Sequence, residues 1–146
     1  MKDQQIINLL RKNNLKVTTQ RLVVTKYILS RVDHPSADQI YKDLHDEFPT
    51  ISLGTVYKTL NSLKEIGIVQ ELGFGEGAVK YDPNTKVHIN MVCTQCNSIH
   101  DYYPNQIEIS WNNLVKNLPV KPVGQRIDVY YKCEICKKRD LQSMQI

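Results

Sequence analysis

The four cysteines of this 146-residue chain form two pairs with the same internal spacing. Two residues separate Cys93 from Cys96 and Cys133 from Cys136, and 36 residues lie between the pairs. Because the first residues lack the apolar core of a secretion signal, a tetrahedral thiolate zinc site is expected rather than disulfides. Two redox-active Cys-x-x-Cys motifs, or four buried thiols, are the alternatives. We therefore predict one structural Zn²⁺ bound by all four sulfurs.

A second set of possible metal ligands lies just before the first cysteine pair. Asp82, His88 and Asn90 all precede Cys93. A four-sulfur site needs none of them, and imidazole and carboxylate donors suit Fe(II) or Mn(II). His88 and Asn90 are two residues apart in a probable strand, so their side chains point the same way. A neutral amide is a poorer ligand than imidazole, so we expect lower affinity or an altered metal preference.

The other three histidines carry weaker signals. His45 lies in a helical stretch beside two acidic residues and is expected to be solvated. His100 neighbours Asp101, and adjacent strand residues point to opposite faces. If Asp101 faces a metal ion, His100 is then a surface or core-edge residue. His34 precedes a proline and, on residue type alone, reads as a loop residue.

The first half of the chain contains the elements of a DNA reader. Helices are expected at residues 4–13, after a cap at Thr18 or Thr19, from 37 to 48, and from Ser52 to Gly67. Residues 68–81 read as two short strands around a Gly-rich turn. This order is the outline of a winged helix-turn-helix, whose last helix before the wing enters the major groove.

The outward face of that last helix is small or polar, with Gly54, Thr55, Lys58, Thr59, Asn61 and Ser62. DNA contact is the functional interpretation, and an ordinary solvated helix face is the alternative. The formal net charge of +4 is too small to decide between them, so DNA binding would depend on a few well-placed cations.

The second half reads as a small mixed module. Strands are expected at 87–92, 99–103 and around 127–131, with a helix at 105–118. So short a segment buries little core, and a bound zinc would contribute on the order of 10 kcal/mol to its folding. Modules of this kind commonly pair with a second copy, and DNA readers of this architecture are usually two-fold dimers.

Together these patterns predict an α+β protein, with an N-terminal winged helix-turn-helix domain followed by a small αβ dimerisation domain with the four-Cys zinc site. The chain shows no run of 18 or more apolar residues, so no membrane span is expected and a cytoplasmic location follows by default. No Ser/His/Asp set, phosphate loop or His-Glu-x-x-His helix indicates an enzyme.

Several segments resemble the ferric uptake regulator (Fur) family. They are TTQR at 18–21, DHPSADQIY at 33–41, ISLGTVYKTLNSLKEIGIV at 51–69, and VCTQC followed by a second Cys-x-x-Cys. The resemblance covers nearly the whole chain. Within the family, the chain is most similar to the peroxide-responsive repressor (PerR) branch.

The resemblance implies a DNA-binding domain at 1–82 and a dimerisation and metal-binding domain at 83–146. It also implies a regulatory metal site at the hinge, where metal would close the homodimer into the shape that fits a double-stranded DNA operator. In the peroxide branch, a ferrous ion there reacts with hydrogen peroxide and oxidises its own histidine ligands, which releases DNA.

By motif, the regulatory ligands of the family fall on His34, Asp82, His88, Asn90 and Asp101. Asn90 is a departure, because the family has a second histidine there. An aspartate at 101 matches the peroxide branch, whereas iron-uptake members more often have glutamate. The extra histidines of the family's second regulatory site have no counterpart, since Gln125 occupies the expected position.

The resemblance also implies DNA contacts. Tyr57 falls on a tyrosine that approaches bases, with Lys58 and Thr59 after it, and Arg21 falls on an arginine that contacts the DNA backbone. The full predicted DNA-binding set is Arg21, Ser52, Gly54, Thr55, Tyr57, Lys58, Thr59 and Asn61.

The leading hypothesis is therefore a metal-dependent DNA-binding repressor that responds to peroxide or iron, with Zn²⁺ as structural ion and Fe²⁺ or Mn²⁺ as regulatory ion. A zinc-, manganese- or nickel-responsive uptake regulator of the same family is the alternative. A metal-dependent enzyme and a zinc-stabilised interaction module without DNA activity are more distant ones.

Overall fold

The computed structural model describes residues 1–73, 78–122 and 124–143. The chain divides into two compact units, Met1–Thr85 and Lys86–Ile146. Each unit has its own strands and its own cluster of buried side chains.

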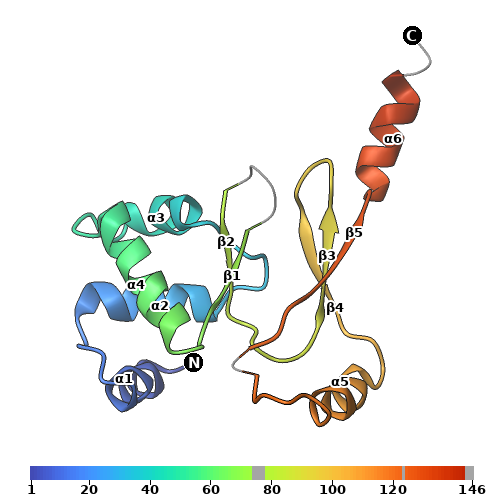
Figure 1. The fold of residues 1–146 in the computed structure, drawn as a ribbon. Coiled ribbons are helices and arrows are strands. Elements are labelled where there is room, and N and C mark those ends of the chain that lie inside the picture. The colour runs from blue at the N-terminus through green and yellow to red at the C-terminus, as the bar shows by residue number, and fades with distance from the viewer. Residues whose placement is uncertain (74–77, 123, 144–146) are drawn as a thin grey trace. The chain divides into compact units, whose positions relative to one another are not determined.

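The first unit begins with four helices, which are α1 (Asp3–Lys12), α2 (Thr19–Leu29), α3 (Ala37–His45) and α4 (Leu53–Glu65) (Figure 1). Three of them begin where the sequence predicts, because the hydroxyls of Thr18, Ser36 and Ser52 each accept a hydrogen bond from a backbone N–H of the first turn. Helix α3 ends at His45, three residues earlier than expected. Helix α4 is followed by Gly67 at φ +71°, a left-handed conformation that glycine adopts at little cost.

All four helices contribute to one hydrophobic core. Its fully buried members recur at helical spacing on α1, α2, α3 and α4, and include Leu10, Ile28, Ile40 and Leu60. Burying a side chain of this size contributes about 1.5–3 kcal/mol. Packing of these stripes therefore fixes the helix that would read DNA.

The wing consists of β1 (Gln70–Leu72) and β2 (Lys80–Asp82), which pair antiparallel with Glu71 opposite Tyr81. The four central residues of the predicted Gly-rich turn, 74–77, lie outside the described residues. On the other side of β2, Ser36 forms a bridge with Lys80, and the Tyr81 N–H donates to the Pro35 carbonyl at 3.0 Å. These bonds hold the segment before α3 beside the end of the wing.

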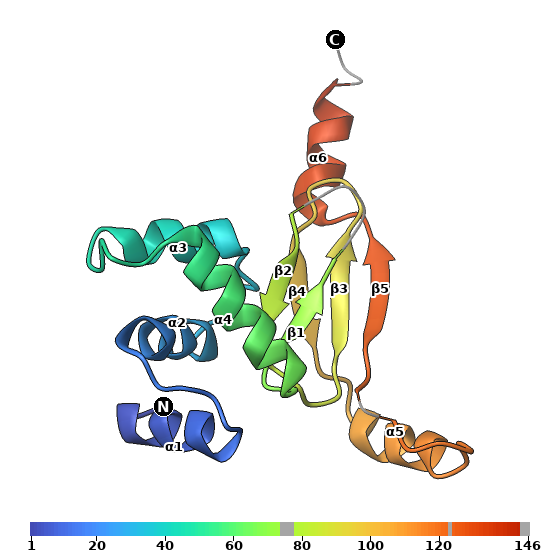
Figure 2. The same cartoon turned by 60° about the vertical axis from the view of Figure 1, so that its left-hand side comes forward.

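The second unit is built on a three-stranded sheet. Strand β3 (Ile89–Cys93) lies in the centre, antiparallel to β4 (Ile99–Tyr102) and parallel to β5 (Ile127–Tyr131) (Figure 2). Helix α5 (Ile107–Val115) lies in the connection between β4 and β5, and α6 (Glu134–Ser143) follows β5.

The winged-helix unit and the mixed αβ unit confirm the predicted fold class. Helix α6 was not predicted from the sequence. In the described part of the chain, no helix is long and apolar enough to cross a lipid bilayer.

Candidate metal sites and DNA-binding surface

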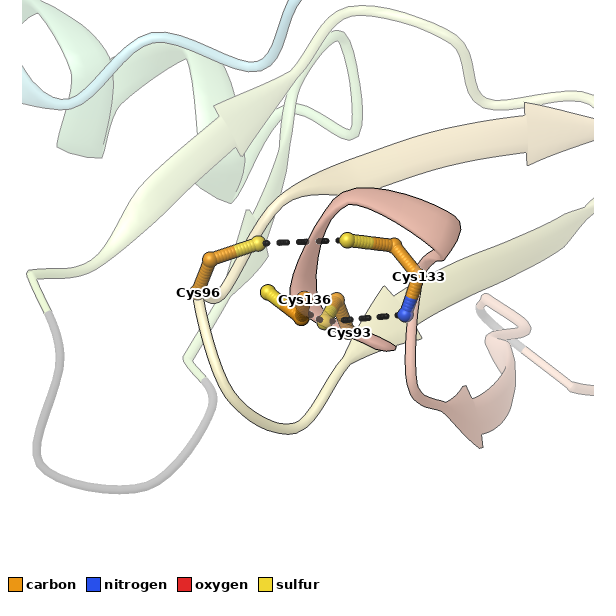
Figure 3. A group of neighbouring side chains, drawn as sticks. All are labelled: Cys93, Cys96, Cys133 and Cys136. Carbon is orange, nitrogen blue, oxygen red and sulfur yellow. Dashed lines mark hydrogen bonds between the residues drawn. The ribbon is translucent and has the colours of Figure 1, made fainter. Parts of the chain in front are cut away.

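The four cysteine sulfurs converge on one point in the second unit (Figure 3). The Sγ atoms of Cys93 and Cys136 are 3.9 Å apart, and those of Cys96 and Cys133 are 3.8 Å apart. A disulfide requires about 2.05 Å, and all four cysteines are free. Sulfurs bound to zinc at about 2.3 Å in a tetrahedron lie about 3.8 Å from one another. The spacing therefore fits one tetrahedral zinc ion.

Local backbone structure aims these sulfurs. Cys93 ends β3, and a tight turn closed by the Cys93 N–H to the Ser98 carbonyl and the Asn97 N–H to the Cys93 carbonyl brings Cys96 back beside it. Cys133 and Cys136 arrive from β5, because the parallel register places Tyr131 beside Cys93. The two pairs are distant in sequence and adjacent in the sheet.

The thiols are in environments that a cation would stabilise. The backbone N–H of Cys133 donates to the Cys93 sulfur at 3.3 Å and lowers the pKa of that thiol to about 6. Burial raises the pKa of Cys136 to about 12. Three of the four cysteines are buried, and buried thiolates need a counter-charge, which a divalent ion that favours sulfur would supply.

The first unit holds a histidine–carboxylate pair. Nε2 of His34 lies 3.8 Å from Oδ1 of Asp82, and both side chains are buried. Asp82 ends β2, while His34 comes from the segment that Pro35 and Ser36 attach to that strand. The backbone N–H of Asn84 donates to Asp82 Oδ1 at 2.7 Å and so orients the carboxylate.

The backbone of His34 is strained. Its φ is +52°, in the left-handed region, and it precedes a proline, which disfavours helical conformations at the preceding residue. Such a conformation costs about 1–3 kcal/mol and is concentrated at functional sites. The strain supports a functional role for a side chain that sequence type alone reads as an ordinary loop residue.

The second unit holds a matching pair. Nε2 of His88 lies 3.6 Å from Oδ1 of Asp101. The carbonyl of Lys86 lies 2.8 Å from Nδ1 of His88, and because a carbonyl only accepts, Nδ1 must carry the proton. Nε2 is then the basic nitrogen of the ring. The phenol of Tyr103 donates to the other carboxylate oxygen, Asp101 Oδ2, at 2.9 Å.

Asn90 lies in a row of polar residues across the sheet. It is paired with Asp101 on β4 and with Asp128 on β5, and its side chain is buried. Its amide nitrogen donates to Asp128 Oδ1 at 3.1 Å and more weakly to the Ile127 carbonyl at 3.4 Å. The predicted strand 87–92 begins only at Ile89, so His88 precedes it, and the shared direction of the His88 and Asn90 side chains stays a prediction.

The remaining histidines are separate from these pairs. His100 is exposed on β4, as expected from its position next to Asp101. His45 is only half-buried at the end of α3, where its ring lies 4.9 Å from that of Tyr41.

Helix α4 presents most of the predicted DNA-binding side chains to solvent. Gly54, Tyr57, Lys58 and Asn61 are exposed, Thr55 is half-buried, and Ser52 is the exposed N-cap. Tyr57 is 41% exposed, and its hydroxyl lies 3.4 Å from a carboxylate oxygen of Asp38 on α3, as the donor of a long hydrogen bond.

The prediction that Thr59 lies on this outer face is wrong. Its side chain is 2% exposed, on the buried face of α4. Thr59 follows Val56 by three residues and precedes Leu63 by four, and those spacings place all three on one side of a helix. Thr59 still borders a hollow at the start of α2, so its predicted DNA contact stays a prediction.

Arg21 lies beside a hollow at the start of α2. A cavity of about 400 Å³ is lined by Lys16, Thr18, Gln20, Arg21, Thr55, Lys58 and Thr59. The Arg21 guanidinium donates to the Lys16 carbonyl at 2.7 Å, which holds it at this position. Three cationic side chains around one hollow give it a positive charge that would attract an anion such as a phosphate.

Three residues near the metal ligands were missed by sequence reasoning. Lys86 acts through its backbone carbonyl, which carries no side-chain signal. Tyr103 is two residues after Asp101, so the strand period could have placed it on the same face. Asp128 is brought to Asn90 only by the pairing of β3 with β5.

Comparisons with known proteins agree over most of the chain. The family model of the ferric uptake regulator family matches residues 12–130. The peroxide-responsive repressor PerR of Staphylococcus epidermidis is 36% identical over 137 residues, which covers 92% of this chain and 90% of that protein.

Solved structures give the same result. The Campylobacter jejuni peroxide stress regulator has a TM-score of 0.69 at 33% identity, covering 91% of this chain and 97% of the other. The Pseudomonas aeruginosa ferric uptake regulator with manganese has a TM-score of 0.75 at 26% identity, covering 87% and 96%. The chain therefore belongs to the ferric uptake regulator family of metal-responsive repressors.

Proposed function

We propose that this protein represses transcription when an exchangeable metal ion occupies a site formed by His34, Asp82, His88, Asn90 and Asp101. The observation that carries the proposal is that each unit holds one imidazole–carboxylate pair, at 3.8 Å in the first and 3.6 Å in the second. His34, Asp82 and His88 are buried, and Asp101 is half-buried. Either pair alone offers one imidazole and one carboxylate, which are too few donors to complete the coordination of a divalent ion. An ion bound by both pairs would link the two units and so control the spacing of the DNA-reading helices in a dimer.

The donor types favour Fe²⁺ or Mn²⁺ in this site and Zn²⁺ among the cysteines. Imidazole and carboxylate groups suit iron and manganese, whereas thiolates select zinc. The relatives named for peroxide response support the same choice. Iron in this site would supply redox chemistry toward hydrogen peroxide. The residues of this chain hold and orient the ligands: Lys86 fixes the tautomer of His88, and Tyr103 fixes the rotamer of Asp101.

DNA recognition is assigned to α4 and the hollow beside Arg21. Tyr57, Lys58 and Asn61 are exposed on one helix that is anchored by its buried stripe. Arg21, Lys16 and Lys58 line the cavity where a backbone phosphate would bind. We assign contacts with DNA bases to the exposed residues of α4 and contacts with the DNA backbone to the cations. We place this activity in the cytoplasm.

A homodimer is proposed from the apolar surface of the second unit. Helix α5 has no buried residue, although its mean composition is apolar, and Ile109, Leu114 and Leu118 are exposed on or next to it. Val129 and Tyr130 are exposed on β5. Exposed apolar side chains in this number are typical of an interface with a second copy.

DNA selection with the metal ion as the only variable tests the proposal. Zinc-loaded protein would be incubated with a random-sequence 40-base-pair duplex library, with and without Mn(II), and the bound DNA sequenced. We expect a two-fold symmetric site to be enriched only with Mn(II), and affinity for it to fall steeply with salt. Enrichment that is equal without Mn(II) would contradict metal control, and no enrichment in either case would contradict DNA-sequence recognition.

The peroxide response needs a separate measurement. Protein loaded with Fe(II) without oxygen would be treated with dilute hydrogen peroxide and analysed by peptide mass spectrometry. We expect one added oxygen on His34 or His88 and loss of operator binding, with His100 as the internal control. Unmodified histidines would leave the alternative, an uptake regulator that responds to metal concentration. Measuring operator binding as a function of added Mn(II), Zn(II) and Ni(II) would then identify the metal.

A further inference from the structure

Asn90 lies where the family pattern has histidine, and the structure shows what holds its amide. The side chain is 2% exposed. Its nitrogen donates to Asp128 Oδ1 and, at greater distance, to the Ile127 carbonyl. Asp128 in turn receives a hydrogen bond from Nε of Arg126, at 3.0 Å to Oδ1, so its carboxylate is fixed from the β5 side.

These partners determine which way the amide faces. An ionised carboxylate and a backbone carbonyl can only accept hydrogen bonds, so the atom of Asn90 that faces them must be the nitrogen. The oxygen, Oδ1, is then directed away from β5. It is buried and has no hydrogen-bond partner among the described residues. A buried amide oxygen without a partner destabilises the fold, and a bound cation would remove that cost.

The sheet register identifies what lies on the other side of Asn90. Asp101 on β4 pairs with it, and His88 comes two residues earlier, just before β3 begins at Ile89. Asn90 therefore lies between Asp128 on β5, which accepts a hydrogen bond from its nitrogen, and Asp101 on β4. Oδ1 of Asp101 is in turn 3.6 Å from Nε2 of His88. Oxygen is the amide atom that coordinates metal ions, whereas the protonated nitrogen cannot.

We propose that Asp128 is a positioning residue of the regulatory metal site, which locks the Asn90 amide with Oδ1 toward the metal and so makes the asparagine a usable ligand. This inference rests on the proposed regulatory site. Asp128 is not itself assigned as a ligand, because Asn90 and Arg126 both donate to its Oδ1, and Nε of Arg126 also lies 2.8 Å from its Oδ2. Partners that orient a ligand in this way typically change metal affinity about 10- to 100-fold when removed.

The test is a double-mutant cycle on Mn(II) affinity, measured by calorimetry on zinc-loaded protein. Asp128→Leu removes the acceptor, and Asn90→Ala removes the proposed ligand. We expect Asp128→Leu to weaken Mn(II) binding by about tenfold or more in the native background and to have no further effect in the Asn90→Ala background. Asp128→Asn keeps an acceptor oxygen at the same place and should restore most of the affinity.

Zinc content and circular dichroism, measured for each variant, would show that the sheet is intact. Equal losses from Asp128→Leu with and without Asn90 would mean that Asp128 supports the strand rather than the ligand, and would overturn the inference. Unchanged Mn(II) affinity in Asp128→Leu would also overturn it. If the native protein binds neither Mn(II) nor Fe(II), the proposed function itself fails. That result differs from the two outcomes above, in which the native protein binds Mn(II) and only the role of Asp128 is wrong.

Discussion

Nδ1 of His88 lies 2.8 Å from the carbonyl of Lys86, while Nε2 of the same ring lies 3.6 Å from Asp101 Oδ1. In the first contact the N–H of Nδ1 donates to the carbonyl, and in the second the basic nitrogen, Nε2, lies beside a carboxylate. A ligating histidine in metal sites usually has this arrangement, with one nitrogen bonded to the protein and the other directed to the ion. The pair is thus oriented as half of a metal site by contacts within the second unit alone.

Replacing His88 with alanine should abolish metal-dependent DNA binding without loss of zinc. The cysteine cluster does not use His88, so zinc content and folding should be unchanged. We expect operator affinity with Mn(II) to fall by about 5- to 150-fold, the usual range of an allosteric coupling factor. Fluorescence anisotropy with labelled operator would measure it. His100→Ala is the matched control, since His100 is exposed on the neighbouring strand; equal losses in both variants would contradict the ligand assignment.

Replacing Cys133 with serine should release zinc and unfold the second unit. Three sulfurs remain, but the tetrahedron loses the Cys133 sulfur, which lies 3.8 Å from that of Cys96. Because structural zinc contributes about 10 kcal/mol or more, this small sheet should not persist without it. Zinc analysis and the fluorescence of Trp111 would report the loss. Ser98→Ala removes only the contact of its hydroxyl with the Cys96 sulfur, at 3.3 Å, and no sulfur ligand, so it should keep zinc. A folded, zinc-free Cys133→Ser protein would contradict a structural role for the ion.

Lys58→Ala should weaken DNA binding to all sequences by a similar factor. Lys58 is exposed on α4 and lines the cavity with Arg21, so its expected contact is with a phosphate. Each phosphate contact that is lost should lower the slope of log affinity against log salt by about 1. The slope would be measured between 50 and 200 mM salt, ranges in which the effect is about linear. Lys138→Ala, on exposed α6, should leave the slope unchanged.

Local patterns predicted most of the elements, and the failures have physical reasons. Caps at Ser36 and Ser52 and the left-handed Gly67 are decided by neighbours within a few residues. Helix α6 gave no signal because its only buried residue is Cys136, so it has no apolar stripe. Thr59 was misplaced because polarity was given more weight than its helical spacing from Val56.

The ligand environment was only partly predictable for a different reason. The spacing of the cysteines is itself a geometric signal, and the sequence therefore predicted their convergence. The bond from Asn90 to Asp128 joins residues 38 apart through the β3–β5 register, which no local pattern specifies. The same holds for the strained backbone of His34, because the two residues after it, Pro35 and Ser36, bond to β2, about 45 residues further along the chain.

Tyr81→Phe should make the first unit less sensitive to alkaline pH. Burial raises the pKa of Tyr81 to about 12, from 10.0. Between these values the unfolded chain loses the phenol proton first, so the free energy of unfolding falls as pH rises through this window. Phenylalanine removes that component. Urea unfolding at pH 7, 9.5 and 11, followed by circular dichroism, should show the variant gaining on the native protein as pH rises. Tyr102→Phe, which changes an exposed residue, should show no such gain.

Ile109→Glu should convert the protein to a monomer. Ile109 is 61% exposed on α5, which has no buried residue in the isolated chain, so its apolar surface is expected to be covered by a second copy. An uncompensated charge buried in that interface costs about 3–5 kcal/mol, and every 1.4 kcal/mol is about tenfold in dissociation constant. Sedimentation equilibrium of zinc-loaded protein would therefore show at least about a hundredfold weaker dimer. Val32→Glu is the matched control, because Val32 is 87% exposed in the first unit. A dimer contacts two operator half-sites at once and so binds more tightly than a monomer, which contacts one. The Ile109→Glu protein should therefore also lose operator affinity, while each protomer still binds Mn(II). A variant dimer of native strength would place the interface elsewhere.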